Sequence, residues 1–445
     1  MKLPSAVLLL RSHAARASWA VSDALIGPAI LLLLSPFLLH QLGAAGFGLW
    51  ALATAISGFG SVASLGVGLA TTKYVAEDLG AGNRAAALSV TRTASTVALA
   101  GGLVFIVVLG LAAPALARLA FSRMGDPALV SAALTLGVAL LVVQELDAVY
   151  AGALRGAQRF DAIGKIELSM RPLWATAVAL TAWQSQDTVY ALAAGLCVNL
   201  LKAVLKATWA SSVLRGFCAK TTFDRGQFSR IFHFGKWAWV NGLGIVLFSV
   251  ADRILVGALL GAADLARYSL CLQLTQFVHV VIAAAWQPVI PIVSGARIDA
   301  DRLRQFKRLS LLGGAACLLP PLLVAIASPA ILSVWVSPQF ASENHMLVLG
   351  LFASAALLSF GVPTHHILVG LGEMRLIGII AIVGGILNLS TALVFSAIGV
   401  GAFAIGRMVF ALLTTLYFAR LWQFARSRTR TAAAASDPTA PTAGA

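Results

Sequence analysis

Long apolar segments separated by short polar turns dominate the chain. Each segment has about the 20 residues that a helix needs to cross a hydrocarbon core of roughly 30 Å, and the period-two alternation of a membrane barrel is absent. The pattern predicts an all-α membrane protein with about twelve transmembrane helices. The predicted segments are 18–39, 47–70, 93–117, 128–150, 168–184, 188–212, 235–259, 268–293, 309–327, 346–370, 376–396 and 399–422.

Lys and Arg residues fall on one side of this predicted topology. With the N-terminus inside, the segments facing the cytoplasm hold 24 of them, and the outer turns hold only Arg118, Arg123 and Arg267. Because positive charge collects in cytoplasmic loops, both termini are predicted to be cytoplasmic. The net charge of +15 is then explained without nucleic acid.

A weak internal repeat divides the chain into halves. The sequence Leu-Gly-Ala-Ala occurs at 42–45, after the first segment, and again at 260–263, after the seventh. Six spans in each half give both halves the same orientation, with a pseudo-twofold axis along the membrane normal. We therefore expect two six-helix bundles, which is a transporter layout. The predicted units are 1–213 and 235–424, joined by a cytoplasmic linker at 214–234 and followed by a disordered cytoplasmic tail at 425–445.

Composition and motifs exclude several classes of function. Hydrophobic residues make up 59% of the chain and charged residues 11%, against about 25% charged residues in soluble domains. The nucleotide and hydrolase motifs GxxxxGK[ST], GxGxxG, HExxH and GxSxG are absent, and the four cysteines lack metal-ligand spacing. No catalytic residue, metal site or cofactor is predicted.

Ionisable residues within the apolar segments are the best candidates for function, because each is costly at membrane depth and needs a polar cavity or a partner. Two interpretations remain open for most of them: they line a cavity, or they pair between helices or extend to the interface. Lys202 and Lys206 are four residues apart and share one helix face. The cationic candidates are Arg253, Arg407, Lys202, Lys206 and Arg171, and the acidic ones are Asp23 and Asp252.

Several stretches resemble a known family. Residues 42–50 (LGAAGFGLW), 65–75 (LGVGLATTKYV), 154–161 (LRGAQRFD) and 251–257 (ADRILVG) carry the resemblance, together with Asn388 and the glycine-rich turns at 370–375 and 399–402. They are similar to the bacterial polysaccharide transporters, the O-antigen (Wzx-type) flippases for lipid-linked oligosaccharides. That family belongs to the multidrug/oligosaccharidyl-lipid/polysaccharide exporter superfamily.

The resemblance implies a flippase in the bacterial inner membrane. Its substrate would be an undecaprenyl-diphosphate-linked oligosaccharide, an O-antigen or exopolysaccharide repeat unit, moved by alternating access among membrane lipids. A polysaccharide polymerase and glycosyltransferases would be its partners. The excess of buried cations over acids suits an anionic cargo, with Arg253 and Arg407 expected to hold the diphosphate. Asp23 or Asp252 would couple transport to a proton or Na⁺ gradient.

Two other functions remain open at this point. A cation-coupled multidrug antiporter of the same superfamily would have its acids, rather than its arginines, along the cavity. A membrane polymerase or ligase that acts on the same lipid would carry a cluster of acids and histidines on its outer face.

Overall fold

The computed structural model describes the backbone of residues 5–59, 66–294 and 300–423; the side chains of 5–25, 235–241, 245, 291 and 300 lie outside that description. These residues form helices and turns, with no strand among them. The predicted all-α class is confirmed. The helices are α1 Ser5–Ser57, α3 Val67–Gly80, α4 Arg84–Leu119, α5 Pro127–Gly156, α6 Phe160–Ser185, α7 Thr188–Leu214, α8 Arg225–Ser249, α9 Ala251–Leu260, α10 Ala262–Trp286, α11 Val289–Ser294, α12 Ala300–Trp335, α13 Pro338–Gly370, α14 Met374–Val394 and α15 Gly401–Thr414, with short 3-10 helices η1 Ser122–Met124 and η2 Ser396–Ile398.

Membrane-spanning character is common to most of these helices. Ten stretches of the described chain are long and apolar enough to cross a membrane. The 14-residue α3 and the 26-residue α6 are not among the ten. The protein is therefore a multi-pass membrane protein, and the number twelve stays a prediction.

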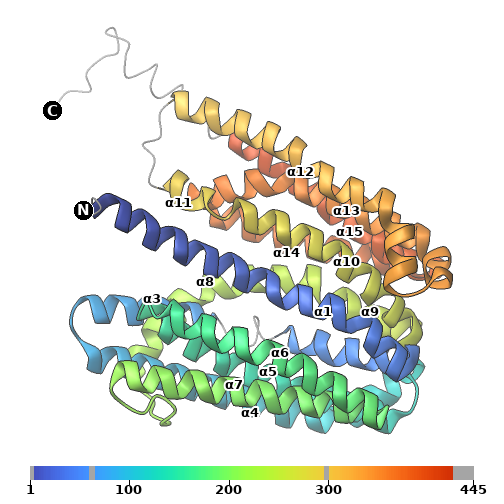
Figure 1. The fold of residues 1–445 in the computed structure, drawn as a ribbon, viewed down its shortest axis with the longest axis horizontal. Helices are drawn as coiled ribbons and strands as arrows, with labels where there is room; N and C mark the ends of the chain where they lie inside the picture. Colours follow the sequence, from blue (N-terminus) through green and yellow to red (C-terminus); the bar gives the residue numbers. More distant parts are fainter. Residues whose placement is uncertain (1–4, 60–65, 295–299, 424–445) are drawn as a thin grey trace.

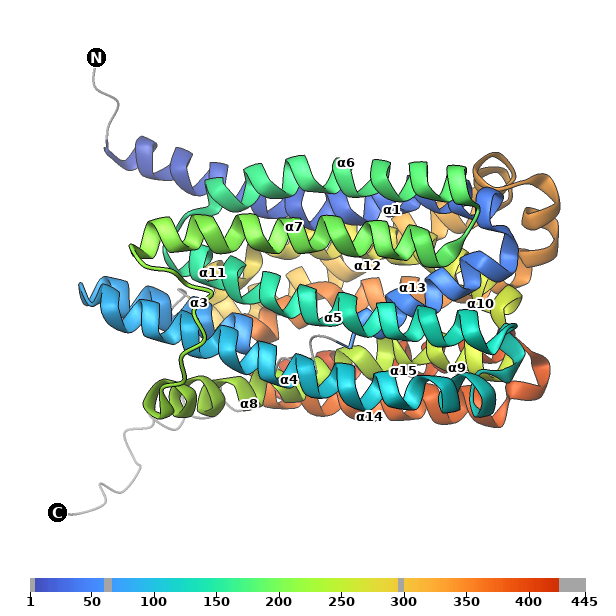
Figure 2. The ribbon, with the colours of Figure 1, turned by 90° about the horizontal axis from the view of Figure 1, so that it is seen from below.

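The helices form two lobes. Figures 1 and 2 show α1 and α3–α7 in one group, the N-terminal lobe, and α9–α15 in the other, the C-terminal lobe, with α8 leading from the first to the second. Helix α8 begins at Arg225, inside the predicted linker 214–234, so the connection is shorter than expected. The connection 215–224 also packs on the N-terminal lobe, because Arg92 of α4 donates a hydrogen bond to the Phe217 carbonyl oxygen over 2.9 Å.

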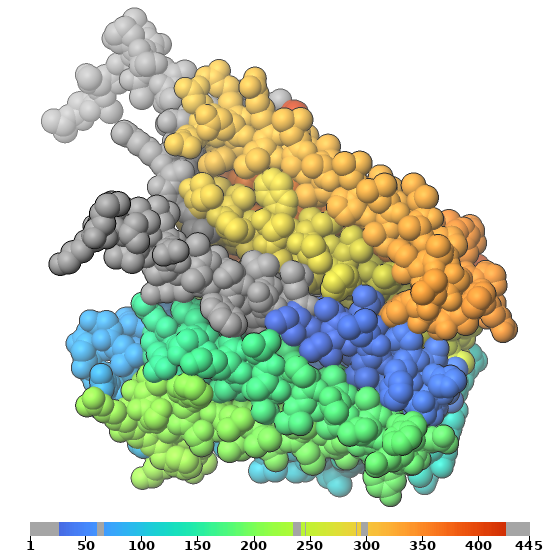
Figure 3. All heavy atoms as spheres, in the orientation of Figure 1, coloured from blue at the N-terminus to red at the C-terminus, as the bar shows by residue number. Residues whose placement is uncertain are grey.

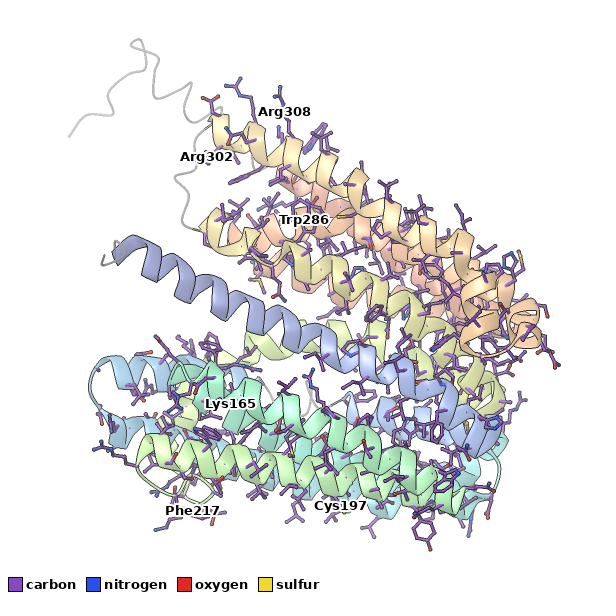
Figure 4. All side chains as sticks on the ribbon, in the orientation of Figure 1. Lys165, Cys197, Phe217, Trp286, Arg302 and Arg308 are labelled. Atoms are coloured by element: carbon purple, nitrogen blue, oxygen red, sulfur yellow. The ribbon has the colours of Figure 1, made fainter. Side chains whose placement is uncertain are left out.

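The two ends of the molecule differ. We call one the basic end: it holds the turns at 81–83, 157–159 and 371–373 and the connection 215–224, and the other is the opposite end. Figure 4 places Arg302 and Arg308 at the basic end, where α12 begins. In Figure 1 the lobes diverge toward the basic end and meet at the opposite end, where α1, α9 and α10 lie together.

Two glycines break the chain direction at matching places in the two halves. Gly43 (φ 69, ψ 175) interrupts α1, and Gly261 (φ 98, ψ −175) separates α9 from α10. Both lie in the repeated Leu-Gly-Ala-Ala sequence, and a positive φ is one that glycine adopts without strain. The lengths of α4 and α12 also match, at 36 residues each. These observations favour a duplicated architecture; the axis along the membrane normal stays a prediction.

Close packing seals the opposite end. A Cβ atom on Gly48 of α1 would lie 2.1 Å from the Ala262 carbonyl oxygen at the start of α10, so the two backbones are in direct contact. Arg123 donates to the Leu259 carbonyl oxygen over 2.6 Å and joins the lobes at the same end. One apolar core continues from α1 and α5 into α10 and α13. Figure 3 shows the blue part of α1 between the N-terminal lobe, in green, and the C-terminal lobe, in yellow and orange.

Candidate functional site

A helix break in the C-terminal lobe positions the first group of charges. Helix α8 ends at Ser249 and α9 begins at Ala251, with Val250 (φ −123, ψ −46) between them. Asp252 and Arg253 therefore lie in the first turn of α9, where the helix dipole favours a carboxylate. The Asp252 Oδ1 accepts a hydrogen bond from the Arg253 backbone N–H over 2.8 Å.

Asp252 is fully buried and its second carboxylate oxygen has two partners. Tyr268 of α10 donates its hydroxyl to Asp252 Oδ2 over 2.5 Å, and Arg407 of α15 approaches the same oxygen to 2.6 Å. Arg407 also donates to the Phe248 carbonyl oxygen over 3.0 Å and lies 4.1 Å from the Phe248 ring centroid. The guanidinium thus compensates both the carboxylate and a carbonyl group near the end of α8.

In this arrangement Arg253 and Arg407, which were predicted to play the same part, have different partners. Arg407 is 4% exposed and its charge is matched by Asp252, so it joins three helices within the C-terminal lobe. The sequence left an interhelical pair open as one alternative, and for Arg407 that alternative is the one the structure contains. Arg407 still contributes to the lining of the cavity described below.

Arg253 differs from Arg407 because its side chain has little compensation. Its Nη2 donates to the Gln276 Oε1 of α10 over 3.2 Å, and its buried Nε has no hydrogen-bond partner. Among the residues whose side chains are described, no carboxylate pairs with Arg253 within 4.0 Å. A buried guanidinium without a carboxylate is costly, so this position suits an anionic ligand.

The Arg253 side chain lines a cavity between the lobes. The cavity has a volume of about 600 Å³ and is bounded by α1 on one side and by α8, α9, α10, α13 and α15 on the other. Its walls are mostly apolar, with a few polar groups at defined points. The polar lining residues are Thr54, Ser249, Arg253, Gln273, Thr275, Gln276, His279, Ser354 and Arg407.

A second group of charges lies within the N-terminal lobe. A pocket of about 360 Å³ is lined by α1, α5, α6 and α7, and it brings together three of the predicted cations. Four cationic and two acidic side chains line it, which gives a net positive pocket. The charged lining residues are Asp147, Arg155, Glu167, Arg171, Lys202 and Lys206.

The two acids of this pocket hold the cations unequally. Lys206 is 1% exposed, and its ammonium lies 2.8 Å from Asp147 Oδ2 and 2.5 Å from Glu167 Oε1. Lys202, on the same face of α7, is farther from both acids, at 3.7 and 3.8 Å. Arg171 donates to Glu167 over 2.8 Å. The Lys202 ammonium is therefore better placed than that of Lys206 to bind another anion, because Lys206 is closely paired with two carboxylates of the protein.

Sequence analysis missed several members of these groups. Glu167 lies one residue outside the predicted segment 168–184, and its position four residues before Arg171 was a usable signal. Gln273 and Gln276 were also not predicted. Two amide side chains close together inside an apolar segment were the signal that could have identified them. The side chain of Asp23, predicted to couple an ion, lies outside the described residues. In the described part of the chain, no cluster of three His, Cys, Asp or Glu residues could hold a metal ion.

Comparison with known proteins places this geometry in context. The family model described as polysaccharide biosynthesis protein matches residues 41–342. The chain is 22% identical over 169 residues to a Bacillus subtilis (strain 168) protein described as uncharacterized membrane protein EpsK. That alignment covers 37% of this chain and 33% of the relative, so it spans about a third of the relative's length.

Solved structures share the fold. The inward-facing conformation of a multidrug resistance MATE family transporter of the MOP superfamily matches with a TM-score of 0.74 at 16% identity, covering 93% of this chain and 99% of that one. The outward-facing conformation of such a transporter gives 0.56 at 15% identity, covering 92% and 99%. The eukaryotic MATE transporter AtDTX14 gives 0.61 at 15% identity, covering 94% and 98%.

Proposed function

The chain belongs to the polysaccharide biosynthesis protein family, and on that premise we propose that it is a flippase for an undecaprenyl-diphosphate-linked oligosaccharide. In this proposal the substrate moves from the inner to the outer leaflet of a bacterial inner membrane by alternating access between the two lobes. The observation that carries the proposal is the half-buried Arg253 side chain, whose Nε is buried and which lines an interlobe cavity without a carboxylate partner among the described side chains.

The chemistry of the substrate fits this cavity. A diphosphate needs cationic hydrogen-bond donors, and arginine binds phosphate oxygens with two parallel N–H groups. Arg253 has such donors free of any described acid. Arg407 would assist only by lining the same cavity, because its charge is held by Asp252.

The N-terminal pocket supplies further cations for the same anionic cargo. We assign Lys202, Lys206 and Arg171 to substrate binding at this second position, with Lys202 in direct contact and Lys206 and Arg171 setting its potential. These three cations outnumber the acids Asp147 and Glu167, and Arg155 adds a further positive charge to the pocket. A long lipid-linked head group could then pass from one cationic position to the next.

The arrangement of the lobes supports an alternating-access cycle. The lobes meet at the opposite end and diverge toward the basic end, so the described state would receive substrate from the basic end. With the basic end in the cytoplasm, this is the side on which the lipid-linked precursor would be loaded. If an ion gradient drives the cycle, Asp23 or Asp252 would carry the ion, and Asp252 would first have to release Arg407.

A cation-coupled multidrug antiporter is the second candidate. The acids Asp252, Asp147 and Glu167, of which Asp252 and Glu167 are buried, favour it, as does the likeness in fold to MATE transporters. The argument against it is that each of these acids is already paired with a cationic side chain of the protein. A membrane polymerase or ligase has the least support, because the family match and the fold both point to transport.

Complementation of a flippase-null bacterium tests the proposal. Wild-type protein should restore surface polysaccharide, Arg253→Ala should restore about a tenth or less, and the exposed Arg308→Ala should behave as wild type, since one charged hydrogen bond is worth about 1.5–3 kcal/mol. Membrane levels of the three proteins should be equal. Efflux of cationic dyes by the wild type, without restored polysaccharide, would favour the antiporter and contradict the proposal.

A further inference from the structure

Three polar residues form a stripe along one face of α10. Ser269, Gln273 and Gln276 are spaced by four and three residues, so their side chains lie on one face of the helix. All three line a small cavity of about 60 Å³ at the seam between α10 and α1. On the α1 side the lining includes Ser35 and Thr54. The seam therefore has a polar interior where the lobes meet.

Several polar atoms around this small cavity have no partner. The Arg253 Nε, the Ser269 Oγ and the Gln273 Oε1 are buried and make no hydrogen bond within the described part of the chain. The α1 hydroxyls cannot donate to them, since Ser35 donates to the Leu31 carbonyl oxygen over 2.7 Å and Thr54 donates within its own helix. Buried polar atoms are nearly always hydrogen-bonded, and three orphaned atoms around one void call for a partner that the closed seam does not supply.

The size of the void limits what it holds in this state. A cavity of about 60 Å³ accommodates on the order of two water molecules, which need polar partners of this kind. A larger ligand reaches Gln273 and Gln276 from the cavity of about 600 Å³ that they also line, but it reaches Ser269 only if α1 and α10 separate. That separation is the movement that alternating access demands at the opposite end.

The chemistry of the orphaned atoms points to one class of ligand. The Arg253 Nε–H is a donor, the Gln273 Oε1 is an acceptor, and the Ser269 hydroxyl is both. The guanidinium disfavours a metal cation, and the Gln273 carbonyl oxygen disfavours an anion at its end of the void. A hydroxyl group can accept a hydrogen bond from the Arg253 Nε–H and donate one to the Gln273 Oε1, so this set of donors and acceptors matches the hydroxyl groups of a sugar.

We propose that Ser269, Gln273 and Gln276 bind hydroxyls of the sugar next to the diphosphate when α1 and α10 part. Arg253 lines both this void and the larger cavity, so a phosphate on Arg253 brings the first sugar to the stripe. The inference rests on the proposed function and adds to it a sugar-reading position. When α1 and α10 are in contact, the stripe holds water. When they separate, the sugar of the head group replaces that water.

Lipid binding by purified full-length protein separates this role from a structural one. The two probes are undecaprenyl diphosphate and undecaprenyl-diphosphate hexose, titrated by native mass spectrometry. Wild-type protein should bind the hexose lipid about tenfold more tightly, the equivalent of one or two hydrogen bonds to buried groups. Ser269→Ala should remove that difference and leave the affinity for undecaprenyl diphosphate unchanged, because Ser269 is not part of the lining of the larger cavity. Gln273→Met should also remove the difference.

A stability measurement supplies a second arm and a control. Gln273→Met and Ser269→Ala each delete an orphaned polar atom, so both should raise the melting temperature. Ser328→Ala deletes a buried hydroxyl that donates to the Ala325 carbonyl oxygen over 2.7 Å. This control variant should not raise the melting temperature. Ser328→Ala should also keep the preference for the hexose lipid.

The outcomes distinguish this inference from the proposed function. If the stripe variants keep the preference for the hexose lipid, or lose affinity for both lipids equally, the stripe does not read a sugar. If wild-type protein binds neither lipid, the proposed function fails, and the inference fails with it.

Discussion

The two arginines at the interlobe cavity show how local pairing decides what a buried charge does. Both lie at membrane depth, and both were expected to hold a diphosphate. Asp252 compensates Arg407 at 2.6 Å, whereas Arg253 contacts only the neutral Gln276. We therefore expect stability to depend mainly on Arg407, and we propose that Arg253 binds the ligand.

Breaking the Asp252–Arg407 pair should destabilise the protein. Arg407→Met or Asp252→Leu alone leaves a buried charge uncompensated, which typically costs about 3–5 kcal/mol. The double variant removes both charges and should recover most of that loss. Thermal unfolding in detergent measures all three, and single variants as stable as the wild type would contradict the assignment.

This pairing could not be read from the sequence. Asp252 and Arg407 are 155 residues apart, and nothing in a single sequence states that α9 and α15 are neighbours. What the sequence did supply was the list of buried charges, because an ionisable residue in an apolar segment is conspicuous. Which of them pair depends on helix rotation, and that is a tertiary property.

At the scale of elements, the hydropathy pattern predicted where the helices lie but did not predict where they begin and end. Every predicted segment overlaps a helix, but α4 and α12 extend to 36 residues where about 25 and 19 were expected. Hydropathy marks only the part in contact with hydrocarbon, and a helix continues into water at no penalty. The break at Val250 was missed because no proline or glycine marks it, whereas the break at Gly43 lies in the repeated motif that was noticed.

Contact between α1 and α10 should be sensitive to side-chain size at Gly48. Because its Cβ would lie 2.1 Å from the Ala262 carbonyl oxygen, Gly48→Leu forces the two helices apart and should cost about 1–3 kcal/mol or more. Gly101→Leu on α4 is the matched control, since a Cβ there meets nothing within 4 Å. The measurement is the melting temperature of each variant; equal values would show that the seam is not tightly packed.

At the scale of the whole molecule, the distribution of charge assigns the two ends. The basic end should face the cytoplasm, because Lys and Arg collect there. In a variant lacking the native cysteines, Gln186→Cys lies in an exposed turn at the opposite end and Ala81→Cys in an exposed turn at the basic end. A membrane-impermeant thiol reagent added to intact spheroplasts should label the first and spare the second. The reverse pattern would invert the topology.

The account as a whole describes two lobes that are sealed at one end around a cavity, with the Arg253 guanidinium in its wall and no carboxylate within 4.0 Å of that guanidinium among the described side chains. Its central claim is that Arg253 binds the diphosphate of a lipid-linked saccharide during transport. The fold alone does not distinguish this cargo from a cationic drug, because MATE transporters share it. The charge of the cargo is the property that separates the two.

Translocation in proteoliposomes tests this claim most directly. Wild-type protein should move an undecaprenyl-diphosphate-linked oligosaccharide to the opposite leaflet, and Arg253→Ala should slow that movement by about tenfold or more at unchanged stability. Arg308→Ala should match the wild type. Equal rates for Arg253→Ala and wild-type protein would contradict the account.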